Sequence, residues 1–399
     1  MSSLNETVSA ERVHIGFYGM RNAGKSSVVN AVTGQNLSIV SNVKGTTTDP
    51  VRKAMELLPL GPVVIIDTPG LDDSGEVGRL RVKKAKEQLG RTDIAVLIVD
   101  AVTGLRDADH DLLNTFKVRG IPYVVVYNKA DLLEERRPLM DNEIYVSAVT
   151  GENIYELKEL IASFAKGLTN ERHIISDLIE PGDMVVLVVP IDESAPKGRL
   201  ILPQQQTMRD LLDANCIFAC CQETELLSTI QSLSRKPALV VTDSQVFEEV
   251  SAITPPDIPL TSFSILFARY KGDLYELVKG AKKLAELKDG DNVLMAEGCT
   301  HHRQCYDIGT YKFPHWIEDY TGAKPNYTYT SGLEYSDELK QYDLVIHCGG
   351  CMLNEKEMRS RIRAAVEAGV PIVNYGVAIA QMHGILDRCL SPFGELHYD

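Results

Sequence analysis

A glycine-rich turn between an apolar strand and a helix constrains the fold of this chain most. Val13–Tyr18 is predicted to be a strand, and a helix is expected to begin at Lys25. The turn, GMRNAGKS at 19–26, matches the phosphate-binding pattern G-x-x-x-x-G-K-S in the strand–turn–helix context that this pattern requires. The chain is therefore predicted to contain a P-loop nucleotide-binding domain of the α/β class.

The chemistry of the turn assigns a role to each of its parts. Backbone N–H groups and the positive end of the following helix are expected to surround the phosphates. Lys25 reaches the β- and γ-phosphates, and the Ser26 hydroxyl is expected to bind Mg²⁺. The residues predicted to bind nucleotide here are Gly19, Asn22, Ala23, Gly24, Lys25, Ser26 and Ser27.

Two further motifs are expected to act on the γ-phosphate. GTTTD at 45–49 is predicted to be a switch loop in which Thr47 binds Mg²⁺, with Thr48 as the alternative. DTPG at 67–70 follows an apolar strand, where Asp67 suits the Mg²⁺ shell and the N–H of Gly70 suits the γ-phosphate. The predicted catalytic residues are Lys25, Thr47, Asp67 and Gly70.

The base is predicted to be guanine. NKAD at 128–131 ends another strand, and the Asp131 carboxylate can accept hydrogen bonds from both N1–H and the exocyclic amine of guanine. Adenine lacks this donor pair, so the motif selects GTP over ATP. The predicted base-site residues are Asn128, Lys129 and Asp131, with Ser147 and Ala148 as a weaker motif.

The order of predicted elements divides the chain into three α/β segments. Strands at Val63–Asp67, Ile94–Asp100, Tyr123–Tyr127 and Glu143–Val146 are expected to form a parallel sheet covered by helices on both faces. The predicted domains are 1–170, 171–270 and 271–399. In the middle segment, the apolar run Thr261–Ala268 is predicted to be a strand.

Three thiols and two imidazoles in the last segment form a candidate metal site. Cys299 and His301 follow one predicted strand, and His347, Cys348 and Cys351 follow another. Ligands gather beyond the carboxyl ends of parallel strands, so the two groups are expected to meet. Cysteine and histidine ligands suit Zn²⁺, whereas three thiolates also suit a [4Fe–4S] cluster with one open iron. The remaining cysteines, Cys305 among them, are expected to be buried or partly buried.

Composition excludes some classes of partner. The 399-residue chain carries a formal net charge of −14, so broad binding to nucleic acid is not expected. Neither a signal peptide nor an apolar run of membrane-spanning length is visible, so we expect a cytoplasmic protein without a membrane partner.

The nucleotide-binding part resembles the TrmE–Era–Der superfamily of GTPases through GMRNAGKSS, GTTTD, DTPG and NKAD. Leu71 follows DTPG where Ras-like proteins place a glutamine that orients water, so slow intrinsic hydrolysis is expected. In the superfamily an asparagine at the position of Asn22 helps to bind K⁺. The resemblance therefore implies GTPase activity stimulated by K⁺.

Taken together, the GTPase motifs, the middle α/β segment and the C-x-H…H-C-x-x-C signature resemble the HydF family of [FeFe]-hydrogenase maturation GTPases along the entire chain. The resemblance implies a homodimer with dimer contacts in 171–270. It also implies a [4Fe–4S] cluster on Cys299, Cys348 and Cys351, with a less certain ligand role for His301 and His347. Such a scaffold would receive a diiron precursor from radical-SAM maturases and deliver it to apo-[FeFe]-hydrogenase.

Two alternatives stay open at this point, a zinc-binding regulatory GTPase and an RNA- or ribosome-associated GTPase. A hypothesis joins the ends of the chain: GTP orders the switch loops, hydrolysis frees them, and the change gates partner exchange.

Overall fold

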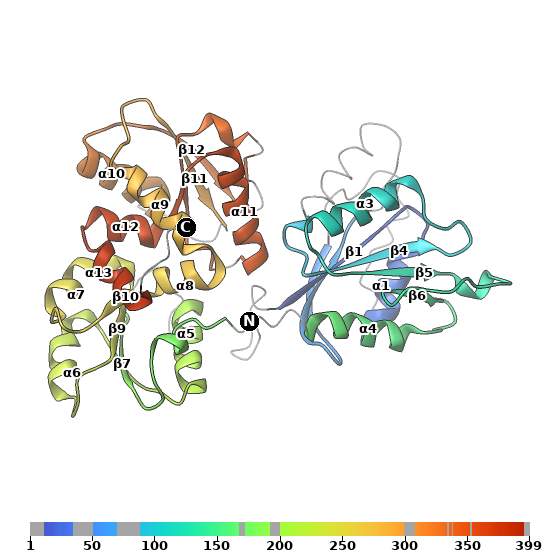
Figure 1. The fold of residues 1–399 in the computed structure, drawn as a ribbon, viewed down its shortest axis with the longest axis horizontal. Helices are drawn as coiled ribbons and strands as arrows, with labels where there is room; N and C mark the ends of the chain where they lie inside the picture. Colours follow the sequence, from blue (N-terminus) through green and yellow to red (C-terminus); the bar gives the residue numbers. More distant parts are fainter. Residues whose placement is uncertain are drawn as a thin grey trace. The chain divides into compact units, whose positions relative to one another are not determined.

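The computed structural model describes residues 12–34, 51–69, 88–166, 172–191, 200–298, 308–332, 335–336, 338–351 and 353–394. The chain divides between residues 171 and 172 into two compact units (Figure 1). In the part that the structure describes, no helix is long and apolar enough to cross a membrane.

The first unit is built on a six-stranded sheet of order β2-β3-β1-β4-β5-β6. Every neighbouring pair is parallel except β2–β3, which a short turn joins as an antiparallel hairpin. The predicted parallel sheet is thus correct for five strands, and the antiparallel edge strand was not foreseen. The strands are β1 (Val13–Gly19), β2 (Val51–Leu57), β3 (Gly61–Asp67), β4 (Ile94–Asp100), β5 (Tyr123–Asn128) and β6 (Glu143–Val146).

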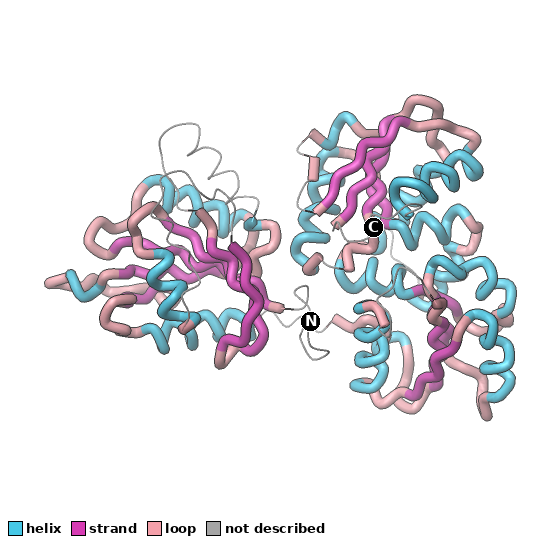
Figure 2. The backbone as a smooth tube through the Cα atoms, turned by 180° about the vertical axis from the view of Figure 1, so that it is seen from behind, coloured by secondary structure: helices cyan, strands magenta, loops and turns pink. Residues whose placement is uncertain are grey.

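Helices cover both faces of this sheet, as Figure 2 shows in magenta and cyan. Helices α1 (Lys25–Thr33) and α4 (Ile154–Lys166) share one apolar cluster with the sheet, and α3 (Asp107–Val118) shares the other. Strand β4 is buried at every residue from Ile94 to Val99, because both of its faces are covered. The polar residues that end such strands are therefore the first that ligands can reach.

The second unit contains two four-stranded sheets in which all pairs are parallel. The first has the order β10-β9-β7-β8, from β7 (Met184–Val188), β8 (Ile217–Cys221), β9 (Leu239–Thr242) and β10 (Leu260–Ser262). Its helices are α5 (Leu202–Asp213), α6 (Leu226–Ser232), α7 (Phe247–Ile253) and α8 (Phe263–Lys271).

The predicted strand over Thr261–Ala268 is wrong for most of its length. The strand ends at Ser262, whose hydroxyl accepts a hydrogen bond from the N–H of Ile265 and so caps helix α8. The hydroxyl of a helix-capping serine accepts a hydrogen bond from a backbone N–H in the first turn of the helix. In a strand, that N–H would bond to the neighbouring strand instead. The apolar run is therefore helical, and its residues are buried on more than one side.

The last sheet has the order β12-β11-β13-β14, and the loop that holds Cys348 and Cys351 begins where β13 ends. Its strands are β11 (Asn292–Glu297), β12 (Asn326–Ser331), β13 (Leu344–His347) and β14 (Ile372–Asn374). Its helices are α9 (Leu274–Leu284), α10 (Phe313–Thr321), α11 (Glu355–Ala368), α12 (Tyr375–Met382) and α13 (Leu386–Leu390).

The three predicted domains each correspond to one sheet, yet residues 172–399 form one compact unit. The border expected at 270 falls at the end of α8 and stays a prediction. Among the cysteines outside the candidate site, Cys216 and Cys389 are buried and Cys221 is half-buried. Cys220 is exposed on β8, contrary to the expectation, because β8 is an edge strand.

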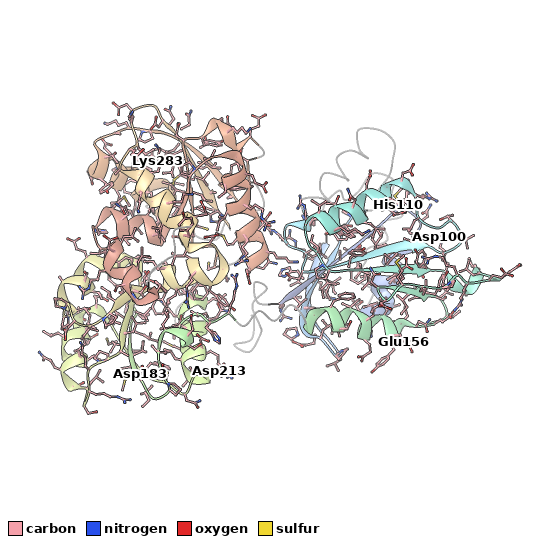
Figure 3. All side chains as sticks on the ribbon, viewed as in Figure 1. Asp100, His110, Glu156, Asp183, Asp213 and Lys283 are labelled. Atoms are coloured by element: carbon pink, nitrogen blue, oxygen red, sulfur yellow. The ribbon has the colours of Figure 1, made fainter. Side chains whose placement is uncertain are left out.

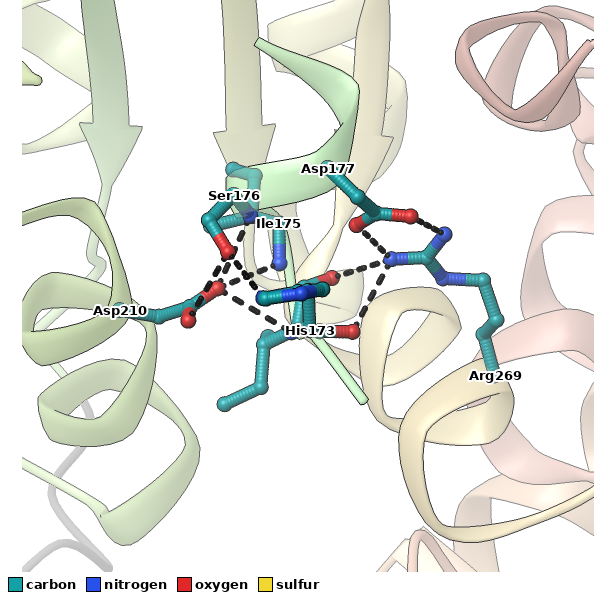
Figure 4. A network of polar contacts seen from close by, with 7 residues as sticks. His173, Ile175, Ser176, Asp177, Asp210 and Arg269 are labelled. Carbon is teal, nitrogen blue, oxygen red and sulfur yellow. Dashed lines mark hydrogen bonds and ion pairs between the residues drawn. The ribbon is translucent and has the colours of Figure 1, made fainter. Parts of the chain in front are cut away.

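A polar network fastens the start of the second unit to its helices (Figure 4). Asp210 on α5 accepts hydrogen bonds from the N–H groups of Ile174, Ile175 and Ser176 at 3.1, 2.8 and 2.9 Å. On the other side, the guanidinium of Arg269 on α8 forms a bidentate ion pair with the Asp177 carboxylate, with N–O distances of 2.6 and 2.7 Å. Partial burial would raise the pKa of Asp177, but the hydrogen bonds and charge of Arg269 outweigh it and lower that pKa.

Replacing Arg269 by methionine is expected to destabilise the second unit. The guanidinium also donates to the carbonyl of Ile174 at 3.0 Å, so its loss removes several charge-assisted hydrogen bonds. We expect the free energy of unfolding to fall by about 1–2 kcal/mol, measured by urea denaturation. Arg209→Met is the matched control, because its pair with Asp213 is exposed and should contribute nothing measurable. Equal midpoints for both variants would contradict the expectation.

Candidate functional site

The P-loop adopts the shape that its glycines permit. Gly24 has φ 84°, and a Cβ there would lie 2.1 Å from the side-chain nitrogen of Asn128. Gly19 has φ 154°, and a Cβ there would lie 2.4 Å from the carbonyl oxygen of Ile98. Only glycine fits at these two positions, since a side chain would meet the backbone of β4 or the amide of Asn128.

Lys25 and Asp67 converge beneath this loop. Lys25 begins α1 and is only 9% exposed, and its ammonium forms an ion pair with the Asp67 carboxylate at the end of β3. The parallel register of β1 and β3, which pairs Phe17 with Asp67, brings them together. The residue predicted to contact phosphate therefore lies beside the residue predicted for the Mg²⁺ shell.

Asn128 ties three nucleotide motifs together. It is buried, and its side-chain amide donates to the carbonyl of Ala23 in the P-loop at 3.0 Å. The oxygen of the same amide accepts a hydrogen bond from the N–H of Ala148 at 3.1 Å. One side chain thus holds the phosphate loop and both predicted base motifs in a fixed relation.

Lys129 connects the base motif to the outer side of the P-loop. Its ammonium donates to the carbonyl of Asn22 at 2.9 Å and to Asp100 at 2.5 Å. Figure 3 labels Asp100, which ends β4. Partial burial would raise the pKa of Asp100, but the hydrogen bond from Lys129 outweighs it and lowers that pKa. The sequence analysis did not assign Asp100, although a carboxylate at the end of a central parallel strand was a usable signal.

Asp131, Ser147, Ser26 and Ser27 complete the described part of the predicted nucleotide site. Asp131 is exposed at the first turn beyond β5, as recognition of a base requires. Ser147 is fully buried and holds the loop after β6, because its hydroxyl and its carbonyl accept hydrogen bonds from the N–H groups of Thr150 and Gly151. Ser26 and Ser27 lie in the first turn of α1.

Several predicted site residues lie outside the described part of the chain. In the nucleotide site these are Thr47, Thr48, Gly70 and Leu71. In the candidate metal site they are Cys299 and His301, together with the neighbouring Cys305.

The two described thiols of the candidate metal site lie on one loop, between β13 and α11. The Cys348 sulfur accepts a hydrogen bond from the N–H of Gly298 at 3.0 Å. Gly298 follows β11 and precedes Cys299 in the sequence. The parallel pairing of Ala296 with His347 is what brings these two loops together.

Burial keeps the Cys348 thiol neutral when no metal is bound. It raises the pKa of this thiol to about 11, although the N–H groups of Gly298 and Gly350 and the charge of Arg361 act in the opposite direction. A metal displaces the thiol proton when it binds, and N–H donors aimed at sulfur are a feature that tunes iron–sulfur clusters. The chemistry of this donor set therefore fits a thiolate-bound metal or cluster.

His347 is held by hydrogen bonds at both ring nitrogens. It is fully buried; its Nδ1 lies 2.7 Å from the carbonyl of Cys348, and its Nε2 lies 3.1 Å from the Arg361 guanidinium. Because Arg361 can only donate, Nε2 is the acceptor and Nδ1 carries the proton. Burial and the charge of Arg361 lower the His347 pKa to about 3, so the imidazole is neutral. This arrangement favours a supporting role for His347 over ligation.

Two buried cations behind the thiolate loop escaped the sequence analysis. Arg361 is 2% exposed on α11, where it pairs with Glu357 and donates to the carbonyl of Gly332 at 2.7 Å. Lys271 is 4% exposed at the end of α8. Arg361 shares the helical face of Met358, Ile362 and Ala365, all buried, and this spacing was the available signal.

Among the described residues, no group of three or more His, Cys, Asp or Glu side chains is placed to hold a metal ion. Cys299 and His301 lie outside these residues. The structure therefore places Cys348 and Cys351 on one loop next to Gly298, and it leaves the complete ligand set a prediction.

Three family models match successive parts of the chain. The "50S ribosome-binding GTPase" model matches residues 14–129. The "Hydrogen maturase F dimerization domain" model matches 174–272, and the "Hydrogen maturase F tetramerization domain" model matches 275–392. The two maturase models together cover both sheets of the second unit.

Two curated relatives are similar to part of this chain. The tRNA modification GTPase MnmE of Legionella pneumophila (strain Paris) is 39% identical over 147 residues, which are 36% of this chain and 32% of that protein. The MnmE of Xanthomonas oryzae pv. oryzae (strain PXO99A) is 35% identical over 159 residues, 39% of this chain and 34% of that protein. The chain thus spans about a third of the length of these relatives.

Two solved structures match part of this chain. A probable GTP-binding protein engB is 23% identical with a TM-score of 0.33, covering 39% of this chain and 100% of that one. Aquifex aeolicus Era is 21% identical with a TM-score of 0.35, covering 52% of this chain and 91% of that one.

With its GTPase domain followed by the dimerisation and tetramerisation domains of hydrogen maturase F, the chain belongs to the hydrogen maturase F (HydF) family of maturation GTPases.

Proposed function

We propose that this maturation GTPase is a scaffold that binds a [4Fe–4S] cluster through Cys299, Cys348 and Cys351, carries a diiron precursor, and delivers it to apo-[FeFe]-hydrogenase. The observation that supports this most directly is the hydrogen bond from Gly298 to the Cys348 sulfur, because it joins the two cysteine-bearing loops. Radical-SAM maturases would supply the precursor. The scaffold would work as a cytoplasmic homodimer, which the mass of the purified chain in solution tests.

The hydrogen bonds of His347 limit how the donor set could bind a metal. Zinc in a structural site takes four protein ligands, and His347 already has both ring nitrogens in hydrogen bonds, so a closed zinc site would have to use His301 beside the three thiolates. Three thiolates without that imidazole leave one iron of a cubane with an exchangeable position. When bound, such a cluster would supply an open iron to which cargo can attach, and this chain's residues would hold and shield it.

The GTPase end would hydrolyse GTP with Mg²⁺ bound by Ser26, Thr47 and Asp67. Lys25 would leave its pair with Asp67 to contact the β- and γ-phosphates, and Mg²⁺ would replace the ammonium as the cation beside that carboxylate. Gly70 would donate its N–H to the γ-phosphate. Asp131 would select guanine, while Asn128 keeps the base and phosphate motifs in register.

The Asn22 side chain would help to bind a K⁺ ion at this site, as the resemblance to the superfamily implies. Its side chain is exposed, it has φ 67°, and its carbonyl is already bound by Lys129, so the amide is the part free to reach a cation. A cation next to the β- and γ-phosphates would stabilise charge that develops during hydrolysis.

GTP turnover is expected to be at least about tenfold faster in K⁺ than in Na⁺, since one well-placed charge contact is worth about 10²–10³ in rate. Asn22→Ala should abolish the difference between the two salts. Arg21→Ala, at the neighbouring exposed position of the loop, should keep it. Phosphate release measured at matched ionic strength gives the ratio, and equal turnover of the wild type in both salts would remove K⁺ from the mechanism.

Anaerobic reconstitution tests the cluster. The wild-type chain is expected to become brown, with about four irons per chain and the EPR signal of a reduced [4Fe–4S] cluster. Cys348→Ser should lose most of the iron, because it removes a ligand and leaves two thiolates. Cys220→Ser, at an exposed cysteine on β8, should retain it. A colourless wild-type protein with one zinc per chain would favour the zinc-binding regulatory GTPase instead.

Lys25→Ala tests whether nucleotide chemistry serves delivery. The variant should hydrolyse GTP about 10²–10³-fold more slowly and keep its full iron content, because Lys25 lies in the other compact unit. Delivery, read as hydrogenase activity that develops after loaded protein meets the apo-enzyme, should slow at least about tenfold, on the same electrostatic grounds. Lys117→Ala, exposed on α3, is the control. Delivery by Lys25→Ala at the wild-type rate would uncouple the two activities.

A further inference from the structure

The carboxylate that ends β4 holds the lysine of the base motif against the P-loop. Asp100 is 17% exposed, and its Oδ2 accepts a hydrogen bond from the Lys129 ammonium at 2.5 Å. Its Oδ1 accepts a hydrogen bond from the N–H of Val102 at 2.9 Å, so both oxygens have a fixed donor. The same ammonium donates to the Asn22 carbonyl at 2.9 Å. Asp100 therefore reaches the P-loop through Lys129.

Two strained backbone positions meet at this ammonium. Lys129 and Asn22 both have φ 67°, in the left-handed region that residues other than glycine rarely adopt. Such a conformation costs free energy and persists only where the surrounding contacts hold it. The hydrogen bond from Lys129 to the Asn22 carbonyl is one such contact, and the charge of Asp100 keeps the ammonium in place to make it.

The position of Lys129 also affects the turn that carries the base motif. Asn128 ends β5 opposite Asp100 in the sheet register, and its carbonyl accepts a hydrogen bond from the N–H of Ala101 at 2.8 Å. Lys129 follows as the left-handed residue at which the chain leaves the sheet, and Asp131 lies in the short helical turn that comes next. An anchor on the Lys129 side chain therefore restricts the turn that presents the Asp131 carboxylate.

We propose that Asp100 is a positioning residue for guanine recognition, which holds the Lys129 ammonium between the base motif and the P-loop. The inference rests on the guanine recognition by Asp131 proposed above, and it is independent of the candidate metal site. Without the charge of Asp100, water would compete for the ammonium, and the turn that carries Asp131 would be held less firmly. GTP and GDP should both bind more weakly, because they carry the same base.

Inosine triphosphate separates recognition of the base from a general loss of affinity. Its base keeps N1–H but lacks the exocyclic amine, so the wild type should bind GTP about tenfold more tightly, the value of one hydrogen bond to a charged acceptor. Asp100→Asn keeps the size of the side chain and removes its charge. In this variant the Kd values of GTP and GDP should both rise about tenfold, and the preference for GTP over inosine triphosphate should fall at least about threefold.

A matched control and a double variant show whether Asp100 acts through Lys129. Asp111→Asn removes an exposed carboxylate from α3 in the same unit and should leave the affinities for all three nucleotides unchanged. The double variant Asp100→Asn/Lys129→Met should bind GTP no more weakly than Lys129→Met alone, because the effects of two side chains that act as one unit are not additive. Titration calorimetry on the full-length chain measures all of these affinities.

The outcomes that overturn the inference differ from those that overturn the proposed base site. If the wild type binds GTP and inosine triphosphate equally well, the base site fails, and the inference fails with it. If the wild type prefers GTP and Asp100→Asn keeps the full preference, only the role of Asp100 is wrong, even if the variant melts at a lower temperature. Additive losses in the double variant would also overturn that role. If Asp100→Asn does not fold, Lys129→Met decides, because a full preference for GTP in that variant would leave Asp100 nothing through which to act.

Discussion

The parallel register of β11 and β13 is the constraint on which the candidate cluster site depends. Ala296 pairs with His347, so the strands β11 and β13 end side by side at the same end of the sheet. The residues that follow the two strands therefore begin next to each other. The hydrogen bond from Gly298 to the Cys348 sulfur follows directly from this register. A slip by one residue would turn every side chain of β13 to the opposite face.

The motifs at strand ends could be predicted from the sequence. Their residue types are suited to binding a ligand, and they stand at the ends of predicted strands, where ligands bind. Lys25, Asp67 and Asn128 each follow a predicted strand, and the structure brings them to one edge of the first sheet. Arg361 and Lys271 could not be read this way. Their burial depends on which helix faces pack behind β13, and a charged residue on a helix normally signals a solvated face.

The local sequence pattern also gave a wrong prediction where a strand and a helix were both compatible with a short segment. The apolar run from Thr261 to Ala268 has strand-like composition, but a capping serine at 262 makes most of it helical. This helix delivers Lys271 to the thiolate loop, so the misread segment is also the one that supports the candidate metal site. The role of this helix can be recognised only in the folded chain, where the end of α8 contacts the turn after β13.

The nucleotide motifs and the described thiols lie in different compact units, and this limits how GTP could act on the proposed cargo. A ligand shifts an equilibrium only by the difference in its affinity for the two states. GTP therefore gates delivery only if it binds one arrangement of the switch loops better than another and partners distinguish those arrangements. A tenfold effect requires about 1.4 kcal/mol of such a difference, which ordering of a switch loop by γ-phosphate and Mg²⁺ can supply. The contacts that hold the loop of Cys348 and Cys351, from Lys271 and from the N–H of Gly298, need not change during such a cycle.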